Sequence, residues 1–296
     1  MKTVKNIKKI TSAMKLVAAS KLRRAEADMR QSRHLVAPLV AMIPDEPGAS
    51  TASAVTVPVT SDRGLCGGIN SGIARAARAT HLAAVDSIAP ADASVADSDA
   101  ASAASAEEDS SASVPGARFL IVGEKGRALL QRGNAQDFLG VVSETAKTRL
   151  TFATASEIAA QVCTTRPAAV RVLFNKFETA ISYQPTVATA LAGPQLLAAL
   201  GRAGAVDGYL WEGPPGDDEA SVADDLAEFH LAATLYNALL ENSASENASR
   251  MQAMESSTKN ASEMIDKLSI TYNRARQASI TTELIEIISG ASALEG

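Results

Sequence analysis

The 73 residues from Asp217 to Ser289 contain neither glycine nor proline. These two residues interrupt helices most strongly, so their absence over such a length predicts helix. A continuous helix of this length would measure about 110 Å, which is more than a globular domain can bury. The run therefore predicts a coiled coil, a membrane span, a helical array, or helices joined by loops without glycine or proline.

The spacing of apolar and small side chains along this run favours the coiled coil. They recur mostly in alternating steps of three and four residues, which gives a seam with a period near 3.5. Many charged residues lie between them, and these exclude a membrane span. The seam is poor in leucine, so the helix needs a partner to stay straight. Its predicted members are Phe229, Ala233, Tyr236, Leu240, Ala244, Met251, Met254, Thr258, Ala261, Ile265, Leu268, Tyr272 and Ala275.

The N-terminal segment is the predicted partner. Met1 to Ala37 contains no glycine or proline, and Pro38 is expected to end its helix. At about 55 Å this helix can pair with only part of the longer one, so we expect the turns near Glu283 to Ser289 to be unpaired. One lysine in its seam would pack its stem and keep its ammonium in water. The predicted seam residues are Ile7, Ile10, Met14, Val17, Lys21 and Ala25.

The region between the two helices alternates predicted strands and helices, which indicates an α/β layer with a partly parallel sheet. Pro58 places the first strand at an edge of this sheet. The predicted fold class is α+β, an antiparallel coiled coil of long N- and C-terminal helices with an inserted α/β domain. Strands are expected at 55–60, 119–122 and 169–174 and from Thr179, with helices at 73–84, up to Gln131 and at 156–162.

Charge is distributed unevenly along the chain. Residues 85–114 carry seven acids and no base, and almost no large apolar residue lies among them, so residues 86–113 are interpreted as a disordered acidic insertion. Hinges are expected at 44–53 and 213–218. Residues 1–33 carry ten Lys or Arg and two acids. This basic segment fits a solvated helix face, a nucleic-acid contact or a mitochondrial transit peptide, although the unbroken heptad counts against the last.

No arrangement of residues predicts a catalytic, cofactor or metal site. The glycine-rich loop at 64–68 lacks the Lys-Ser/Thr of a phosphate-binding loop, so a simple strand-to-helix turn is the favoured interpretation. Cys66 and Cys163 are far apart and have no metal or redox spacing, which indicates two reduced thiols. No run of about 18 apolar residues predicts a membrane span.

Four segments resemble the gamma subunit, or central stalk, of rotary proton-translocating ATP synthases. They are KNIKKITSAMKLVAASK (Lys5–Lys21), TSDRGLCGG (Thr60–Gly68), FNKF (Phe174–Phe177) and YNRARQASITTELIEIISG (Tyr272–Gly290). The resemblance implies a Rossmann-like globular foot on the c-ring and a coiled coil inside the ring of alpha and beta subunits. It implies a rotor shaft that transmits c-ring rotation, driven by proton flow, to the catalytic beta subunits for ATP synthesis. Such a chain would have no catalytic site or cofactor of its own.

The resemblance also implies contact residues and domain bounds. Arg276 and Gln277 match residues that catch a loop of beta, and the other matched beta contacts are Met14, Lys21, Arg250, Thr281 and Glu283. Tyr209, Trp211 and Glu212 match the residues that touch the c-ring, although Gly213 departs from the family pattern. We expect an N-terminal helix over 1–43, a foot domain over 55–213 and a C-terminal helix over 217–296.

Other expectations concern partners and location. Small central-stalk subunits of the delta or epsilon type are implied as further partners, and nucleic acid is not. The acidic insertion favours the matrix side of the mitochondrial inner membrane over the cytoplasmic side of a bacterial plasma membrane. The cysteine pair of chloroplast relatives is absent, which disfavours thiol regulation. The competing readings are a structural coiled-coil tether with an inserted α/β module and a nucleotide-dependent enzyme with a helical arm.

Overall fold

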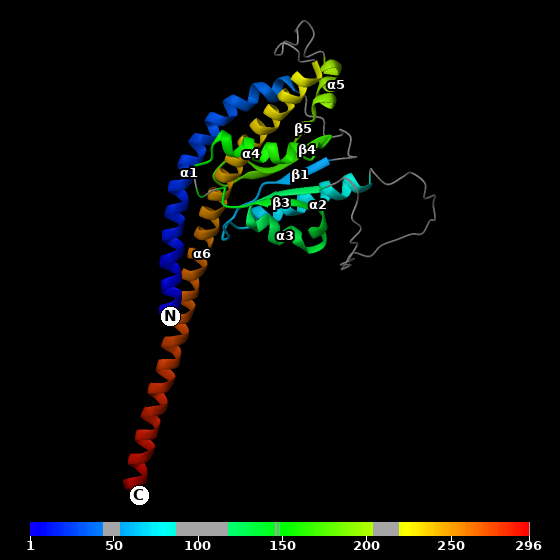
Figure 1. The fold of residues 1–296 in the computed structure, drawn as a ribbon. Helices are drawn as coiled ribbons and strands as arrows, with labels where there is room; N and C mark the ends of the chain where they lie inside the picture. The colour runs from blue at the N-terminus through cyan, green and yellow to red at the C-terminus, as the bar shows by residue number, and fades with distance from the viewer. Residues whose placement is uncertain (44–53, 87–117, 146, 148, 204–218, 296) are drawn as a thin grey trace, which may run out of the picture.

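The two ends of the chain form long helices that lie side by side and run in opposite directions (Figure 1). The computed structural model describes residues 1–43, 54–86, 118–145, 147, 149–203 and 219–295. Helix α1 spans Lys2–Met42, and helix α6 spans Glu219–Glu295. A five-stranded sheet lies beside one half of this pair. The predicted fold class, an antiparallel coiled coil with an inserted α/β domain, is confirmed.

The contacts between α1 and α6 define where the pairing stops. Lys8 Nζ donates a hydrogen bond to Ser262 Oγ at 3.1 Å, and Lys15 Nζ donates to Glu255 Oε1 at 2.7 Å. The N-terminus of α1 therefore lies beside the middle of α6, and every side chain at 271–291 is exposed. This unpaired end is longer than the predicted Glu283–Ser289, because α1 begins level with the residues just after Ser262.

The seam of α1 differs from the predicted one. Ile7, Ile10 and Val17 are 47 %, 58 % and 57 % exposed, and Lys21 is exposed as well, so these four positions were wrong. The pattern selected an apolar stripe that faces away from α6, whereas apolar, small and polar residues together line the approach to α6. The residues of α1 that are buried or bonded to α6 are Lys8, Thr11, Lys15, Ala18, Leu22, Met29, Ser32, Arg33 and Val36.

The predicted seam of α6 is buried only in its middle part. Its predicted members from Ala233 to Ile265 are buried or partly buried. Phe229 is 44 % exposed and contacts Phe152 of helix α4 (Phe152–Cys163), with ring centroids 5.9 Å apart. Leu268, Tyr272 and Ala275 are exposed. The two ends of the predicted seam were therefore wrong. At the first end α6 packs on the globular domain, and at the second end it packs on nothing in the described chain.

Pro38 does not end α1, contrary to the prediction, and the helix continues to Met42. A proline inside a helix removes one hydrogen bond and crowds the carbonyl four residues earlier. Here that carbonyl belongs to His34, and the side chains of both residues are exposed, so water can reach it. Figure 1 shows α1 curving along the half of α6 that lies beside the sheet.

The sheet is mixed, as predicted, and has the order β3-β2-β1-β4-β5. The first four strands in this order are parallel, and β5 is antiparallel to β4. Two elements were not expected, namely β3 and helix α5, and β5 begins at Tyr183 because Thr179 to Ser182 form a turn. The strands are β1 (Ala54–Pro58), β2 (Arg118–Val122), β3 (Phe138–Val142), β4 (Ala169–Phe177) and β5 (Tyr183–Leu191).

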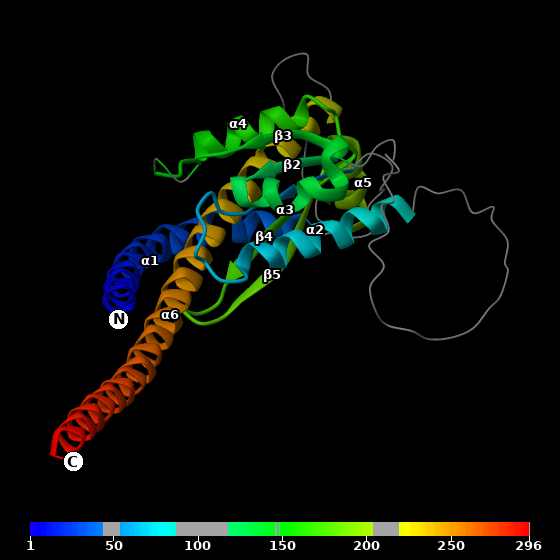
Figure 2. The ribbon, with the colours of Figure 1, turned by 90° about the horizontal axis from the view of Figure 1, so that it is seen from below.

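Helices cover both faces of the sheet (Figure 2). Alternate residues of each strand point to opposite faces, so β2 sends Leu120 toward α4 and α6 and Phe119 toward α2 and α3. A 3-10 turn, η1 (Ala135–Asp137), precedes β3. The helices on the second face are α2 (Ile69–Asp86) and α3 (Glu124–Asn134), and α5 (Gly193–Ala203) packs on α6.

Pro58 lies in β1, which is the central strand, so its predicted edge position was wrong. Proline cannot donate to a neighbouring strand, and the sheet accommodates this by interrupting one ladder. Strand β1 pairs with β2 only at Val55 and Thr56, and the pairing resumes at the bridge between Val59 and Val122. The missing N–H of Pro58 therefore falls where β1 and β2 are not paired.

Some predictions fall outside the described residues. These are the hinges at 44–53 and 213–218 and residues 87–113 of the acidic insertion. Within the described chain, no helix is both long enough and apolar enough to cross a membrane.

Candidate functional site

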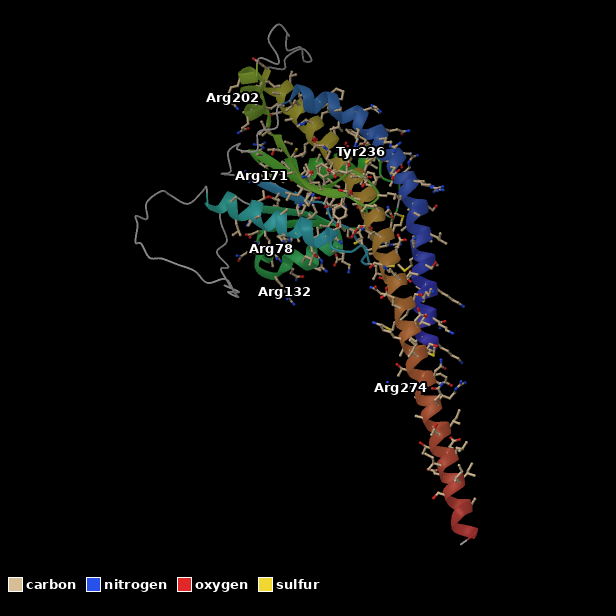
Figure 3. The ribbon with its side chains drawn as sticks, turned by 180° about the vertical axis from the view of Figure 1, so that it is seen from behind. Arg78, Arg132, Arg171, Arg202, Tyr236 and Arg274 are labelled. Atoms are coloured by element: carbon tan, nitrogen blue, oxygen red, sulfur yellow. The ribbon has the colours of Figure 1, made fainter. Side chains whose placement is uncertain are left out.

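Four of the predicted beta-contact residues lie together on the unpaired end of α6. Arg276, Gln277, Thr281 and Glu283 are all exposed. Three of them form hydrogen bonds within the helix, since Thr281 Oγ1 donates to the Gln277 carbonyl at 2.9 Å and Ser279 Oγ donates to Glu283 Oε1 at 3.3 Å. Figure 3 shows Arg274 on this same stretch, standing clear of the rest of the molecule. Their contact with a beta subunit stays a prediction.

The same stretch also exposes large apolar side chains. Leaving isoleucine and leucine side chains in water on several sides of a helix is unfavourable, and burying them against a partner would be favourable. Exposed apolar surfaces of this kind mark interaction sites. Five of these side chains are between 52 % and 72 % exposed, and no described element outside α6 covers them. They are Ile280, Leu284, Ile285, Ile287 and Ile288.

The remaining predicted contacts of the shaft are more varied. Met14 is partly buried and Lys21 is exposed, both on α1. Arg250 has a side chain only 14 % exposed, and it pairs with Glu246 one turn earlier on α6 and with Asn247 at 3.4 Å. Arg250 is thus held by its own helix in the isolated chain. The predicted c-ring residues Tyr209, Trp211 and Glu212 lie outside the described residues.

A set of polar side chains joins α6 to the edge of β4. Ser245 Oγ donates to the carbonyl of Asn175 at 2.9 Å, and the Asn175 amide donates to Asn242 Oδ1 at 3.0 Å. The two asparagines and the serine are buried. Buried hydrogen bonds of this kind fix the relative position of two elements, because breaking them leaves polar groups without water. Sequence reasoning missed this junction.

A charged group lies on the same junction. Arg33 of α1 donates two hydrogen bonds to the carboxylate of Glu241 on α6, from Nε at 2.6 Å and from Nη2 at 3.0 Å. The hydrogen bond to Glu241 raises the pKa of Arg33, with burial opposing it. None of the three interpretations of the N-terminal basic segment, a solvated helix face, a nucleic-acid contact or a transit peptide, predicted this pairing of Arg33. The signal that could have identified it is Glu241 itself, the single acid among residues 229–245 of α6.

The glycine-rich loop packs on the shaft. Ser249 Oγ of α6 donates to the carbonyl of Cys66 at 2.6 Å. Gly67 has φ of +61°, and a Cβ there would lie 3.2 Å from Ser249 Oγ. The left-handed backbone and the close approach to α6 both favour glycine at this position. The loop is therefore a strand-to-helix turn that also packs against α6, and the sequence did not indicate this contact.

A buried pair of titratable groups lies between α2 and η1 in the globular domain. His81 Nε2 lies 3.3 Å from Asp137 Oδ2, and the His81 ring stacks on Phe119 at 4.5 Å. Burial lowers the pKa of His81, and Asp137 opposes this effect. Among the described residues, no group of three His, Cys, Asp or Glu side chains could hold a metal ion.

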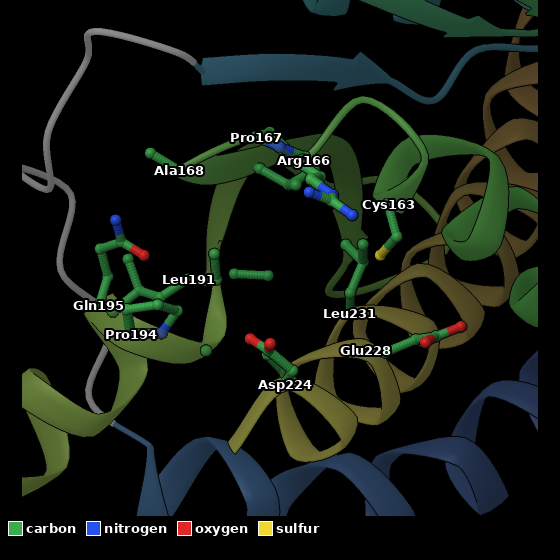
Figure 4. A pocket seen from close by; sticks show the side chains of 15 residues that line it. Cys163, Arg166, Pro167, Ala168, Leu191, Pro194, Gln195, Asp224, Glu228 and Leu231 are labelled. Carbon is green, nitrogen blue, oxygen red and sulfur yellow. The ribbon is translucent and has the colours of Figure 1, made fainter. Parts of the chain in front are cut away.

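A cavity of about 660 Å³ lies between α4, α5, β4 and the start of α6 (Figure 4). Arg166, Asp224 and Glu228 contribute charged side chains to its wall, together with Cys163. Burial and then the nearby carboxylates raise the pKa of the Cys163 thiol, which keeps it protonated and unreactive. The cavity is remote from the unpaired end of α6.

Comparisons with known proteins give a consistent result. The sequence matches the family described as ATP synthase over residues 1–294. It is 41 % identical over 300 residues to the mitochondrial ATP synthase subunit gamma of Arabidopsis thaliana, covering 100 % of this chain and 83 % of that protein. The corresponding protein of Drosophila melanogaster is 34 % identical, with 99 % and 88 % covered.

Solved structures show the same similarity. The chain resembles one in the central stalk and c-ring of the Tetrahymena thermophila mitochondrial ATP synthase, with a TM-score of 0.62 and 29 % identity, covering 84 % of this chain and 99 % of that one. A chain of the Euglena gracilis mitochondrial ATP synthase, at 19 % identity, shares the fold with a TM-score of 0.77, covering 99 % of this chain and 91 % of that one.

Proposed function

The chain belongs to the gamma-subunit family of ATP synthases, and we propose that it is the rotor shaft of such an enzyme. In this proposal proton flow turns a c-ring, the c-ring turns the globular domain, and the shaft carries the rotation to the catalytic beta subunits. The gamma subunit is a non-catalytic subunit of the assembly, so ATP would be made on the beta subunits.

The observation that carries this proposal is the shape of α6. Its first half is fixed to the sheet, its middle pairs with α1, and its last part projects alone with exposed apolar side chains. A projecting helix that is stiff at one end and uncovered at the other suits a shaft whose tip is enclosed by other proteins. Moving one charge across 100 mV releases only about 2.3 kcal/mol, so several steps must be summed, and a stiff shaft allows that summing.

The partner surfaces follow from this arrangement. We assign beta-subunit contacts to the exposed tip and to residues of α1 and α6 in the shaft, and c-ring contacts to the segment 209–212, which precedes α6 in the sequence. Alpha subunits and small central-stalk subunits complete the proposed partners. The residues assigned to beta are Met14, Lys21, Arg250, Arg276, Gln277, Thr281 and Glu283, and those assigned to the c-ring are Tyr209, Trp211 and Glu212.

We also propose three functional units and a location. The units are a coiled-coil helix over 1–43, a foot domain over 55–213 and a coiled-coil helix over 217–296. The location is the matrix side of the mitochondrial inner membrane, supported by the relatives named as mitochondrial. A bacterial plasma membrane is the alternative, since bacterial gamma chains are also similar.

Affinity purification from native membranes tests the proposed function. A tag on the globular domain, at an exposed position of α2, should recover alpha, beta and c-ring subunits in a fixed ratio. A structural tether would instead yield only copies of this chain, and that result would refute the rotor assignment.

A further inference from the structure

Three elements meet at one buried carboxylate. Glu241 of α6 is 2 % exposed, and it accepts hydrogen bonds from Arg33 of α1 and from the backbone N–H of Phe177 at 2.8 Å. Arg33 Nη2 also donates to the carbonyl oxygen of Phe177 at 2.7 Å. Phe177 is the last residue of β4. These bonds form a closed ring, which we call the junction ring, and it joins both shaft helices to the sheet.

The junction ring stands where α6 leaves the globular domain. Before it, Leu231, Leu235 and Ala238 of α6 are buried in the core against the sheet. After it, Ser245 and Ser249 of α6 still bond to the domain. Helix α1 lies beside α6 on both sides of the ring, since Ser32 Oγ donates to Asn237 Oδ1 at 3.2 Å before it and Lys15 bonds to Glu255 after it. The ring is therefore a point at which a force that turns the domain enters both helices of the shaft.

The chemistry of the ring suits a fixed position better than apolar packing does. Charge-assisted hydrogen bonds are directional and short, and an arginine fork holds a carboxylate in one orientation. Apolar contacts in the same place would exclude water equally well and would allow sliding. An exposed ion pair nearby, between Arg149 and Asp28 at 2.9 Å, also joins the domain to α1, but its side chains are 78 % and 31 % exposed. Exposed pairs of this kind contribute little.

We propose that Arg33 and Glu241 are positioning residues that fix the globular domain to both shaft helices, so that torque passes between them without slip. This proposal rests on the function proposed above and extends it to named residues. The apolar cluster around the ring, which includes Leu22 and Leu240, supplies cohesion. The ring supplies the fixed angle.

The test uses the assembled enzyme with its catalytic ring immobilised and a bead attached to the globular domain. The variant is Arg33→Met with Glu241→Met, because replacing an ion pair by apolar residues of similar volume preserves folding in many proteins. In this pair the Glu241 side chain is 2 % exposed and the Arg33 side chain is 41 % exposed. The variance of the bead angle is measured without ATP, and the unloaded ATP hydrolysis rate is measured in the same preparation. The matched control is Arg149→Ala with Asp28→Ala, which removes the exposed pair between α1 and the domain.

We expect the double methionine variant to raise the variance of the bead angle on the order of two-fold, since the bonds of Asn175 and Ser249 remain. Its hydrolysis rate should match the wild type, and its melting temperature should fall by only a few degrees, because the buried N–H of Phe177 loses its acceptor. The control variant should leave all three quantities unchanged. An unchanged variance in a folded, active double variant would overturn the inference. If the wild-type bead did not turn with ATP, the proposed function itself would fail, which is a separate outcome.

Discussion

One pair of substitutions separates the two environments of α6. Leu235 is fully buried against the sheet, whereas Leu284 is 53 % exposed on the unpaired end of the same helix. Changing each to alanine removes the same atoms from the same type of secondary structure. The two variants differ only in what surrounds the leucine, so their effects on the isolated subunit measure the packing directly.

The expected magnitudes follow from that difference. Leu235→Ala removes buried methyl groups and leaves a cavity in the core that includes Ile158 and Val172, which costs about 3 kcal/mol. In a domain of this size that corresponds to a fall in melting temperature of roughly 6–12 °C. Leu284→Ala opens no cavity, and alanine is the better helix former, so its effect should stay within about 0.5 kcal/mol.

Urea unfolding of the two purified variants, followed by circular dichroism, measures both free energies of unfolding. We expect a large loss of unfolding free energy for Leu235→Ala and none for Leu284→Ala. A loss above about 1 kcal/mol for Leu284→Ala would mean that the end of α6 packs in the isolated chain, and the picture of an uncovered tip would be wrong. In the assembled enzyme we expect Leu284→Ala to lower ATP turnover, because partner subunits then cover this leucine.

Three further predictions concern the tip, the buried histidine and a closely packed glycine of α3. Arg276→Ala with Gln277→Ala should slow ATP turnover several-fold while assembly, judged by gel filtration, stays intact; unchanged turnover would refute the contact assignment. Burial lowers the pKa of His81 below 6.5, so the unfolded chain binds a proton that the folded chain refuses, and stability should fall as pH drops below 6.5. His81→Asn should flatten that part of a stability–pH curve, and an unaltered curve would contradict this. Gly126→Ala would place a Cβ 2.5 Å from Thr60 Oγ1 and should lower the free energy of unfolding by about 1–3 kcal/mol, measured by urea titration; a neutral result would contradict the tight packing.

The helical ends were predictable because absence of glycine and proline is a strong local signal. The side of α1 that faces α6 was not, since the predicted stripe of Ile7, Ile10 and Val17 is the outward one. Periodicity identifies an apolar face but does not say which neighbour covers it. In a shaft that is enclosed by other proteins, outward apolar residues are expected, so two similar stripes compete and the pattern cannot choose between them.

The junction with the globular domain was invisible to sequence reasoning for a different reason. Glu241 and Arg33 are 208 positions apart, and their pairing depends on the register of two helices and the end of β4. The glycine loop was interpreted as a turn, but its contact with Ser249 depends on the same tertiary arrangement. Pro58 misled the strand assignment, because an interrupted ladder inside a sheet has no local signature.

The most direct test of the central claim is rotation of the globular domain relative to immobilised beta subunits. With a bead on the exposed surface of α2, addition of ATP to the assembled enzyme should produce continuous rotation in one direction. The same bead should stop when α6 is cross-linked to a beta subunit through Gln277→Cys, and it should resume after reduction. ATP hydrolysis at full rate with the bead stationary would contradict the account.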